Sequence, residues 1–384
     1  MNKLKVMSIF GTRPDAVKMA PLVKELEKYQ ESIESIVCVT AQHREMLDQV
    51  LKRFEITPDY DLNIMQERQT LEQITVRAVE GLSSIFKKNK PDIVLVHGDT
   101  STTFAGSLAA FYNKVAVGHV EAGLRTYDKY FPYPEEMNRR LTGVLTDLHF
   151  APTKSNRDNL LKEGINPEKI YVTGNTVIDA LKTTVSQDYS FINADLNKIE
   201  FKNKRIITVE VHRRENLGKP LNDICEAIRE VAEKYHDVEV IYPVHLNPAV
   251  RETAYKILGG VERVTLTEPI DVQDMHNLLA RSYMVITDSG GLQEESPSLG
   301  TPVLVARNET ERPEAVVAGT VKLAGTNKET IVSLASLLLD NSSEYEKMAK
   351  TVNPYGDGNA SDRIVKALLY EFGYSTEKPA EFNV

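Results

Sequence analysis

Short apolar runs alternate with helix-compatible stretches along most of this chain. Four runs in the first half each lead into a polar or glycine-containing turn, at residues 5–10, 36–39, 92–96 and 115–120. Five more runs follow, at residues 205–211, 238–242, 263–266, 283–287 and 302–306. This repetition predicts an α/β protein with two Rossmann-like domains, each built on a parallel sheet, and a ligand in the cleft between them.

The repetition loosens between Asn175 and Ala194 and begins again at Arg205. We therefore expect an N-terminal domain over residues 1–172 and a C-terminal domain over residues 173–360. The remaining residues, 361–384, contain a helical pattern from Ser361 to Phe372 that is long enough to pack back on the N-terminal domain.

The turn Asp288–Gly291 follows a buried-strand pattern and precedes a helical one. Two glycines let the backbone approach an anion, and the start of a helix directs free N–H groups toward it. Such turns are about as often plain helix starts as ligand sites. Glu294, Glu295 and the polar segment 310–314 place further charge near this turn and favour a ligand site.

Composition excludes several classes of protein. The chain has 384 residues, 41% hydrophobic and 26% charged, with a net charge of −9 and no basic stripe, which argues against binding nucleic acid. No apolar run is long enough to span a membrane, and the N-terminal segment lacks the pattern of a secretory signal. Cys38 and Cys225 lie in separate apolar segments, which is typical of buried free thiols in a reducing cytoplasm.

Individual arginines are more informative than the total charge. Five of them occur near glycine or proline, where we expect loops and contact with an anionic ligand: Arg13, Arg125, Arg139, Arg213 and Arg312.

Two carboxylates follow successive buried runs of the first half. Asp99 and Glu121 would open onto one crevice if their strands are parallel neighbours. The alternative is that Asp99 caps the helix predicted over residues 101–112 and Glu121 makes a loop hydrogen bond. Three further polar residues near the same strand ends favour a site: His97, His119 and Arg125.

The segment 132–140, PYPEEMNRR, places two acids and two arginines after two prolines at the start of a helix. It is either a solvated first turn with i, i+4 pairs or a rigid loop that presents these side chains to a ligand, and the prolines favour the second. The segment 212–216, HRREN, follows a buried run in the same way, and His245 follows the next. No histidine has a partner at metal-ligand spacing, so no metal is expected.

Taken together, ten motifs in order along residues 11–320 resemble the non-hydrolysing bacterial UDP-N-acetylglucosamine 2-epimerases. They are GTRPDAVKMAP, TAQHREMLDQV, VHGDTSTTFAGSLAAF, GHVEAGLRT, PYPEEMNRRL, TGNTVIDAL, HRREN, YPVHLNP, TDSGGLQEE and ERPEAVVAGT. The resemblance implies a GT-B fold, a cytoplasmic homodimer, and interconversion of UDP-N-acetylglucosamine with UDP-N-acetylmannosamine for cell-surface polysaccharide. It implies no cofactor.

The resemblance also implies roles for residues. The catalytic positions match Asp99, Glu121, Glu135, Arg139 and His212, without indicating which carboxylate removes the C2 proton. Substrate positions match Arg13 and Lys18, the diphosphate cradle matches Ser289, Gly290 and Gly291, the ribose ligand matches Glu295, and Arg312 is a further nucleotide contact. A regulatory site for a second UDP-N-acetylglucosamine, present in some members, matches Gln42, His43, Arg68, Arg213 and His245.

Chemistry gives independent support for this reaction. The hydrogen on sugar C2 is not next to a carbonyl, so an enzyme must either oxidise C3 or expel the nucleotide. No GxGxxG sequence follows any predicted strand, which disfavours oxidation by a nicotinamide. Expulsion of the nucleotide needs a base for the C2 proton and cations for the departing UDP, and the motifs supply both. The resemblance implies that this step is an anti elimination of UDP that gives 2-acetamidoglucal.

Three positions depart from the family pattern, and three rival functions remain. Glu210 replaces a usual threonine two residues before His212, Met275 replaces an aromatic, and Asp15 replaces a glutamate. The carboxylate of Glu210 is expected to affect His212 or local anion affinity. The rivals are a hydrolysing epimerase that releases N-acetylmannosamine and UDP, a GT-B glycosyltransferase, and a nucleotide-sugar sensor without turnover.

Overall fold

The computed structural model describes residues 2–42, 44–66 and 69–383, and these form two compact units. Unit 1 contains the chain up to Ala180 together with Tyr355–Asn383, and unit 2 is Leu181–Pro354. The first unit thus extends past the predicted boundary at residue 172, and the chain returns to it at Tyr355, before residue 361.

Unit 1 is built on a seven-stranded parallel sheet with the order β3-β2-β1-β4-β5-β6-β7. Its strands are β1 (Leu4–Phe10), β2 (Ile33–Val39), β3 (Tyr60–Asp61), β4 (Ile93–His97), β5 (Ala116–Val120), β6 (Leu148–Ala151) and β7 (Ile170–Val172). The central strand β4 is buried along its whole length, as expected for a parallel strand covered on both faces.

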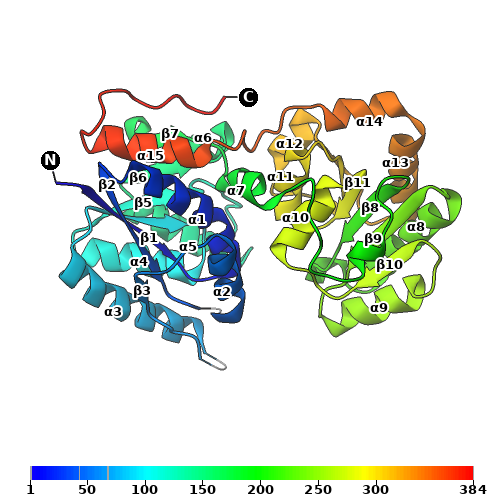
Figure 1. Cartoon of the computed structure of the whole chain (residues 1–384), viewed down its shortest axis with the longest axis horizontal. Helices are drawn as coiled ribbons and strands as arrows, with labels where there is room; N and C mark the ends of the chain where they lie inside the picture. Colours follow the sequence, from blue (N-terminus) through cyan, green and yellow to red (C-terminus); the bar gives the residue numbers. More distant parts are fainter. Residues whose placement is uncertain (1, 43, 67–68, 384) are drawn as a thin grey trace. The chain divides into compact units, whose positions relative to one another are not determined.

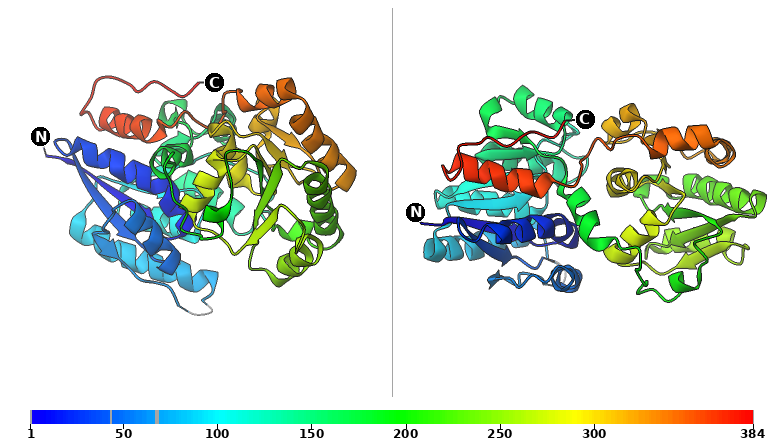
Figure 2. Two further views of the ribbon diagram at one scale, coloured as in Figure 1. Left: turned by 45° about the vertical axis from the view of Figure 1, so that its right-hand side comes forward. Right: turned by 45° about the horizontal axis from the view of Figure 1, so that its top comes forward.

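The helices of unit 1 form two groups. They are α1 (Arg13–Leu26), α2 (Arg44–Arg53), α3 (Leu71–Asn89), α4 (Ser101–Tyr112), α5 (Glu135–Leu145), α6 (Lys154–Lys162) and α15 (Ala360–Glu371), with 3-10 turns at Glu27–Tyr29 and Pro167–Lys169. A further helix, α7 (Thr176–Thr184), begins in unit 1 and continues past its boundary at Ala180. Helices α3, α4 and α5 pack in sequence on one side of the sheet, and α1 lies on the other (Figure 1). Figure 2 shows α15, which begins only at Ala360, beside α1 near the start of the chain.

Unit 2 is built on a six-stranded parallel sheet with the order β10-β9-β8-β11-β12-β13. Its strands are β8 (Arg205–Glu210), β9 (Val238–Pro243), β10 (Val264–Thr267), β11 (Met284–Thr287), β12 (Val303–Val305) and β13 (Val321–Leu323). Its helices are α8 (Lys219–Lys234), α9 (Pro248–Leu258), α10 (Val272–Ala280), α11 (Gly290–Ser298), α12 (Pro313–Ala318), α13 (Lys328–Asp340) and α14 (Ser342–Ala349), with 3-10 turns at Leu196–Lys198 and Arg214–Asn216.

Helix α8 shows why the sequence folds in this way. Its apolar side chains recur at helical spacing, so Leu221, Ile224, Ile228 and Val231 face the sheet and are buried. They form one core with the strands β8, β9 and β11. The polar positions between them remain on the outer face, which fixes the rotation of the helix about its axis.

Both sheets reverse their strand order at one point. In unit 1 the reversal lies between β1 and β4, and in unit 2 it lies between β8 and β11. Ligands of doubly wound sheets bind beyond the carboxyl ends of the strands at such a point. The candidate residues of the sequence therefore need to be located relative to these two strand pairs.

Candidate active site

In unit 1, the carboxylate of Glu121 lies just beyond the end of β5 and is almost fully buried. It forms an ion pair with Lys18 of α1 and accepts a hydrogen bond of 2.8 Å from the side-chain amide of Asn175. The Nε2 atom of His97 lies 3.6 Å from the same carboxylate oxygen. Burial would raise the pKa of Glu121, but Lys18 and His97 hold that pKa well below its ordinary range.

His97, at the end of β4, lies between two carboxylates. Its Nδ1 atom is 3.8 Å from Asp15 of α1, and its Nε2 atom faces Glu121. Asp15 is itself held by a 3.1 Å hydrogen bond from the hydroxyl of Thr100. Burial alone would lower the pKa of His97, but Glu121 and Asp15 together raise it above the ordinary value. The group is therefore a buried network of alternating charge.

Asp99 does not cap the following helix. The N-cap of α4 is Thr100, whose side chain accepts from the backbone N–H of Thr103. Instead, one carboxylate oxygen of Asp99 accepts from both Nε, at 3.1 Å, and Nη2 of Arg139. The side-chain amide of Asn138 also donates to the Asp99 carbonyl, at 2.9 Å. The start of α5 thereby holds the loop that carries Asp99.

The adjacent acids Glu135 and Glu136 have different environments. Glu136 is buried, and its carboxylate accepts from the backbone N–H groups of Thr126 and Tyr127, each at 3.1 Å. Glu135 is half-buried and makes no hydrogen bond or ion pair with the part of the chain that the structure describes. The two acids point in different directions because consecutive helical residues are about 100° apart. Glu136 therefore has a structural role, whereas the carboxylate of Glu135 is available to contact a ligand.

Two expectations about the arginines are wrong. Arg139 lies inside α5 rather than in a loop. Arg125 does lie outside the helices, but its buried guanidinium is occupied by a two-pronged ion pair with Glu163, at 2.8 Å for each hydrogen bond. Because the Arg125 side chain is 0% exposed, a ligand from solution does not reach it.

His119 is a buried histidine with a lowered pKa, which favours its neutral form. Burial lowers its pKa to about 3, and its Nε2 lies 2.7 Å from the carbonyl oxygen of Gly98. A neutral ring that donates to this carbonyl supports the turn that leads to Asp99.

In unit 2, Asp288 organises the end of β8. Its fully buried carboxylate accepts from the backbone N–H of His212, at 3.1 and 3.2 Å, and from that of Arg213, at 2.9 Å. The side-chain amide of Asn216 donates to the same carboxylate at 2.8 Å. One buried carboxylate thus fixes the HRREN turn against the end of β11.

The glycine turn at the start of α11 has the features of an anion cradle. Ser289 is the N-cap residue, yet its side chain makes no capping hydrogen bond, so the first N–H groups of the helix are left for another acceptor. A Cβ atom on Gly290 would lie 3.4 Å from Nη2 of Arg312 and 3.9 Å from Nη2 of Arg213. Two guanidinium groups therefore lie beside the bare backbone, and glycine leaves room for a ligand there.

Acidic side chains hold these two arginines in place. Arg312 forms an ion pair with the buried carboxylate of Glu294, and Nη1 of Arg213 lies 3.4 Å from Glu311. Glu295, one residue after Glu294, lies 3.4 Å from Nε2 of His276. The two adjacent acids of α11 thus have different neighbours: Glu294 is paired with Arg312, whereas Glu295 lies near His276.

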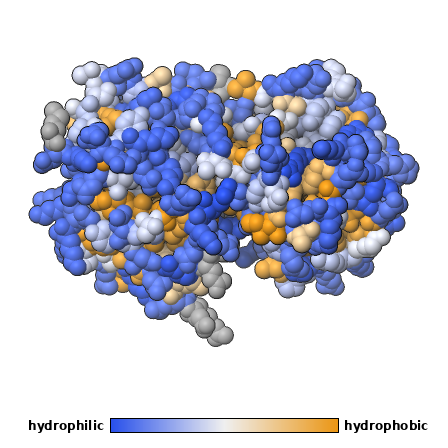
Figure 3. All heavy atoms as spheres, viewed as in Figure 1, coloured by the Kyte–Doolittle hydropathy of each residue, from blue (hydrophilic) through white to orange (hydrophobic). Residues whose placement is uncertain are grey.

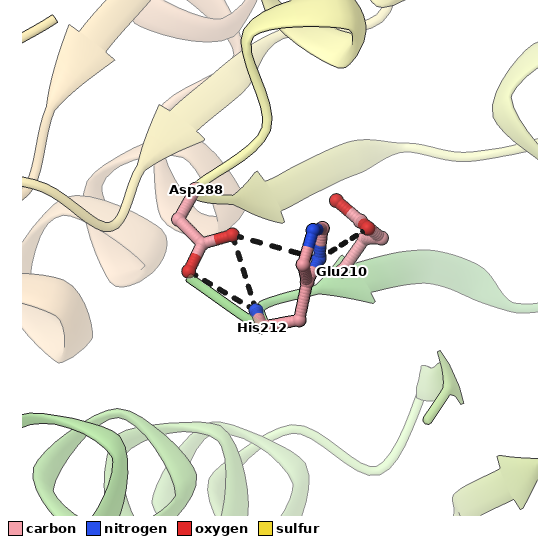
Figure 4. Close-up of side chains that lie close together, drawn as sticks. All are labelled: Glu210, His212 and Asp288. Atoms are coloured by element: carbon pink, nitrogen blue, oxygen red, sulfur yellow. Dashed lines mark hydrogen bonds and ion pairs between the residues drawn. The ribbon is translucent and has the colours of Figure 1, made fainter. Parts of the chain in front are cut away.

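His212 contacts two acids and a second histidine. Figure 4 shows its ring between Asp288 and Glu210, with Nδ1 at 2.7 Å from Glu210 and 3.9 Å from Asp288. His245 stacks on the ring at a centroid distance of 4.8 Å. Atoms of Glu210, His212 and Asp288 lie close enough together to bind a metal ion, but both oxygens of Asp288 already accept backbone N–H groups. The grouping is better explained as a hydrogen-bonded support for His212.

The remaining predicted residues have the following positions. Arg13 begins α1, beyond the end of β1, and Gln42 accepts a 3.2 Å hydrogen bond from Thr102 of α4. His43 and Arg68 lie outside the described residues. Within unit 1 the structure brings together Lys18, Glu121 and His97, and separately Asp99 and Arg139. Within unit 2 it brings together His212 and His245, and separately Gly290, Arg213 and Arg312.

Comparison with known proteins decides the family. Residues 24–369 match the family model described as UDP-N-acetylglucosamine 2-epimerase. The chain belongs to that family. The Bacillus subtilis (strain 168) UDP-N-acetylglucosamine 2-epimerase is 60% identical over 383 residues, which is 100% of each chain.

Solved structures of this epimerase family show the same fold. The S. aureus MnaA–UDP structure is 53% identical with a TM-score of 0.90, covering 99% of this chain and 100% of that one. The Neisseria meningitidis UDP-GlcNAc 2-epimerase bound to UDP-GlcNAc is 51% identical with a TM-score of 0.86, covering 95% and 100%. The predicted GT-B fold, with its two Rossmann-like domains, is confirmed. Among the described residues no helix is both long and apolar enough to cross a membrane.

Several residues that complete these sites lie inside the motifs named above, but the sequence assigns them no partner. Asp288, Asn216 and Asn175 act through hydrogen bonds to residues far away in sequence. Their one shared signal is a polar side chain at or just beyond a strand end, or at the start of a turn or helix. Asp15 and His97 follow the same rule, and their pairing becomes evident only when β1 and β4 are adjacent.

Proposed function

We propose that this epimerase interconverts UDP-N-acetylglucosamine and UDP-N-acetylmannosamine by inverting C2, without releasing a free sugar. The observation that carries the proposal is the cradle at Gly290, where Arg213 and Arg312 adjoin an uncapped helix start. Such a cradle binds a diphosphate both as a substituent of the sugar and as a free anion. The N. meningitidis relative bound to UDP-GlcNAc supports this substrate.

The reaction that fits these groups is an anti elimination followed by a re-addition. A base takes the C2 proton, the C–H electrons form the C1=C2 bond, and the C1–O bond breaks with its electrons on UDP. The intermediate is 2-acetamidoglucal. A proton is then delivered to C2 from the opposite face, and an oxygen of UDP re-forms the bond to C1. C2 loses one proton and gains another, and C1 loses UDP and regains it, so the reaction needs no other reactant.

The three candidate carboxylates differ in their readiness for this proton transfer. Glu121 is held in the charged form by Lys18 and His97, and a carboxylate with a lowered pKa is a weak base. We assign it the role of a fixed negative charge in the sugar site. The carboxylate of Glu135 has no hydrogen bond or ion pair with the described part of the chain. The Asp99 side chain is paired with Arg139 but is still 26% exposed. We therefore assign the two proton transfers at C2 to Glu135 and Asp99.

The nucleotide is assigned to the unit 2 residues. Ser289, Gly290 and Gly291 offer backbone N–H groups to the diphosphate, Arg312 and His212 add positive charge, and Glu295 binds the ribose hydroxyls. Arg13 is assigned to the substrate as well, because it begins α1 without a hydrogen bond or ion pair in the described residues. Retention of UDP by these groups is what allows re-addition instead of loss.

The decisive experiment follows UDP-N-acetylglucosamine in deuterium oxide by proton and phosphorus NMR. The proposal expects deuterium at C2 of both sugar nucleotides, no free sugar, and an equilibrium reached from either side. Glu135→Gln and Asp99→Asn should each abolish deuterium incorporation, while the affinity for UDP, measured by calorimetry, is unchanged.

Each rival predicts a result different from that of the reversible epimerase in the same assay. A hydrolysing epimerase releases free N-acetylmannosamine in step with UDP. A glycosyltransferase gives no deuterium at C2 when no acceptor is present. A sensor gives binding without any change in the sugar. The first result would replace the reversible reaction, and the other two would remove the epimerisation.

A homodimer is part of the proposal because of an apolar surface on unit 1. Helices α3, α4 and α5 pack side by side and expose Val76, Phe111, Tyr112 and Val144 at 53%, 60%, 64% and 81%. Figure 3 shows apolar surface over the region of α3 and α4. Contiguous exposed apolar surface is typical of subunit contacts. Light scattering should give twice the mass of the chain, and Val144→Glu should give the monomer; a monomeric wild type would contradict this.

Regulation by a second substrate molecule is also proposed, at Gln42, His43, Arg68, Arg213 and His245. Arg213 lies beside Gly290 of the cradle, and His245 stacks on His212. Initial rates against UDP-N-acetylglucosamine should be sigmoidal for the wild type and hyperbolic for His245→Ala. A hyperbolic wild type would remove this part of the proposal.

The proposed cellular role is supply of N-acetylmannosamine units for cell-surface polysaccharide from the cytoplasm. It is supported by the reaction, because its product is an activated sugar nucleotide that a transferase can use. A strain without the protein should lack this sugar in its surface polymer, and fractionation should recover the protein with the cytosol.

A further inference from the structure

The carboxylate of Glu210, the last residue of β8, is aimed at the ring of His212. One oxygen, Oε2, lies 3.1 Å from the hydroxyl of Thr287, which donates its single proton either to this oxygen or to the backbone carbonyl of Glu210 at 2.8 Å. The other, Oε1, lies 2.7 Å from Nδ1 of His212. Thr287 thus links Glu210 to the end of β11, and Figure 4 shows the carboxylate of Glu210 beside the ring of His212. Glu210 has no role in the binding or proton transfer described above.

The other groups around the ring cannot replace this contact. Asp288, at the end of β11, is 3.9 Å from Nδ1, and its oxygens are occupied by backbone N–H groups. His245, after β9, stacks on the ring and Arg213 follows it in the chain. The Nδ1 atom is buried and lacks a hydrogen bond to any other described residue. Glu210 is therefore the described residue whose carboxylate can accept a hydrogen bond from Nδ1–H of His212.

We propose that Glu210 is a positioning residue, which holds His212 by Nδ1 as an imidazolium so that Nε2–H donates to the departing diphosphate. Nε2 is on the far side of the ring from Nδ1, and about a third of the His212 side chain, 32%, is exposed. The inference rests on the proposed function, because it takes UDP as the ligand of His212. A carboxylate behind a functional histidine orients the ring and makes it more basic.

The charges of the two histidines agree with this arrangement. Contact with Glu210 raises the pKa of His212 above its ordinary value, against the effect of burial. Desolvation, and then the charge of His212, lowers the pKa of His245. The pKa values of the two stacked rings are thus shifted in opposite directions. When His212 is protonated, the pair Glu210–His212 has no net charge. Its carboxylate lies at Nδ1, so Nε2–H is the end of the ring left to donate to a ligand.

The first experiment measures the two histidine pKa values by NMR on the full-length protein labelled with ¹⁵N-histidine. Signals are assigned from His212→Gln and His245→Gln. In Glu210→Gln, the pKa of His212 should fall, since the contact with the carboxylate is lost.

A matched control is Glu239→Gln. Glu239 is a half-buried strand carboxylate of the same unit that also lies near a threonine hydroxyl, that of Thr265, at 3.5 Å. Among the described residues, the groups that act on the carboxyl pKa of Glu239 are Lys204, Thr265 and Arg263, so both histidine titrations should be unchanged in this variant.

The second experiment measures UDP and uridine binding by calorimetry between about pH 5.5 and 8.5, a range that spans the titration of histidine. In Glu210→Gln, UDP affinity should match or exceed that of the wild type at the acid end, where His212 is protonated without a counter-charge. At the alkaline end it should be roughly tenfold weaker, the difference between a charged and a neutral donor. Uridine, which lacks the diphosphate, should bind both proteins equally.

The outcomes are distinguishable. An unchanged His212 titration in Glu210→Gln overturns the inference, and so does a loss of UDP affinity that is equal at every pH, which would mark a structural role. If the wild type does not bind UDP, the proposed function fails, and the NMR titration still decides whether Glu210 controls the protonation of His212.

Discussion

Replacement of Lys18 by methionine tests the buried charges of unit 1. The Lys18 and Glu121 side chains are 17% and 8% exposed, so the pair is shielded from water. Removal of one partner from a buried pair costs about 3–5 kcal/mol because the other charge is left unpaired. Asn175 still donates to Glu121 and His97 remains 3.6 Å away, so we expect the lower end, about 3 kcal/mol at neutral pH.

The loss should depend on pH in a defined direction. The pKa of Glu121 is lowered in the folded wild type, so its charge stabilises the protein above the pKa of the unfolded state, about 4.3. That stabilisation disappears as the pH falls through the folded pKa. In Lys18→Met the folded pKa of Glu121 rises, and protonation relieves the unpaired charge sooner. The difference between variant and wild type should therefore be largest near neutral pH and shrink toward about pH 4.3.

Urea unfolding followed by far-ultraviolet circular dichroism measures this difference, since the chain has no tryptophan. The matched control is Lys24→Met on the same helix, whose pair with Glu27 is at 3.0 Å but 35% and 43% exposed. It should change stability by less than about 1 kcal/mol. A double-mutant cycle with Glu121→Gln gives the coupling. If Lys18→Met costs no more than the control, or if the cycle shows no coupling, the reasoning is refuted.

Three further predictions follow from the sites. Gly290→Ala places a methyl group 3.4 Å from a guanidinium, so the Kd for UDP should rise several-fold by calorimetry with little change in Tm; unchanged affinity would count against the cradle. Arg139→Met removes the partner of Asp99, so kcat should fall by about 10²-fold or more while UDP affinity is retained; a matching loss of affinity would contradict the division of roles. Burial raises the pKa of Cys38 and of Cys225 to about 12, so neither thiol should react with Ellman's reagent at about pH 8 until urea is added, and rapid labelling of the folded protein would contradict their burial.

The sequence predicts the strands that carry the sites because they are long apolar runs that end in polar turns. The predicted helix at residues 101–112 coincides with α4, and the runs that end at Phe10 and Thr287 end there in the structure. The short strands β6 and β7 are not predicted, because three or four apolar residues do not distinguish a strand from a loop or a helix segment.

The candidate site is predictable as a set of positions, whereas the state of each residue is not. The letters Glu135-Glu136 give two equal acids, and only the packing of α5 makes one a buried anchor. Arg125 has the loop position of a ligand-binding arginine, but its partner Glu163 is 38 residues away in the chain. Such pairings depend on which strands become neighbours, and no local pattern encodes them.

The order in which the chain is synthesised bears on how this fold is reached. Unit 1 needs both its first 180 residues and Tyr355–Asn383, and α15 packs on α1. All the residues of unit 2 up to Pro354 therefore leave the ribosome before unit 1 can be completed. Domains generally fold as units during synthesis. Unit 1 is thus synthesised first but completed last. The surface of α1 that packs on α15 has to remain accessible until α15 leaves the ribosome.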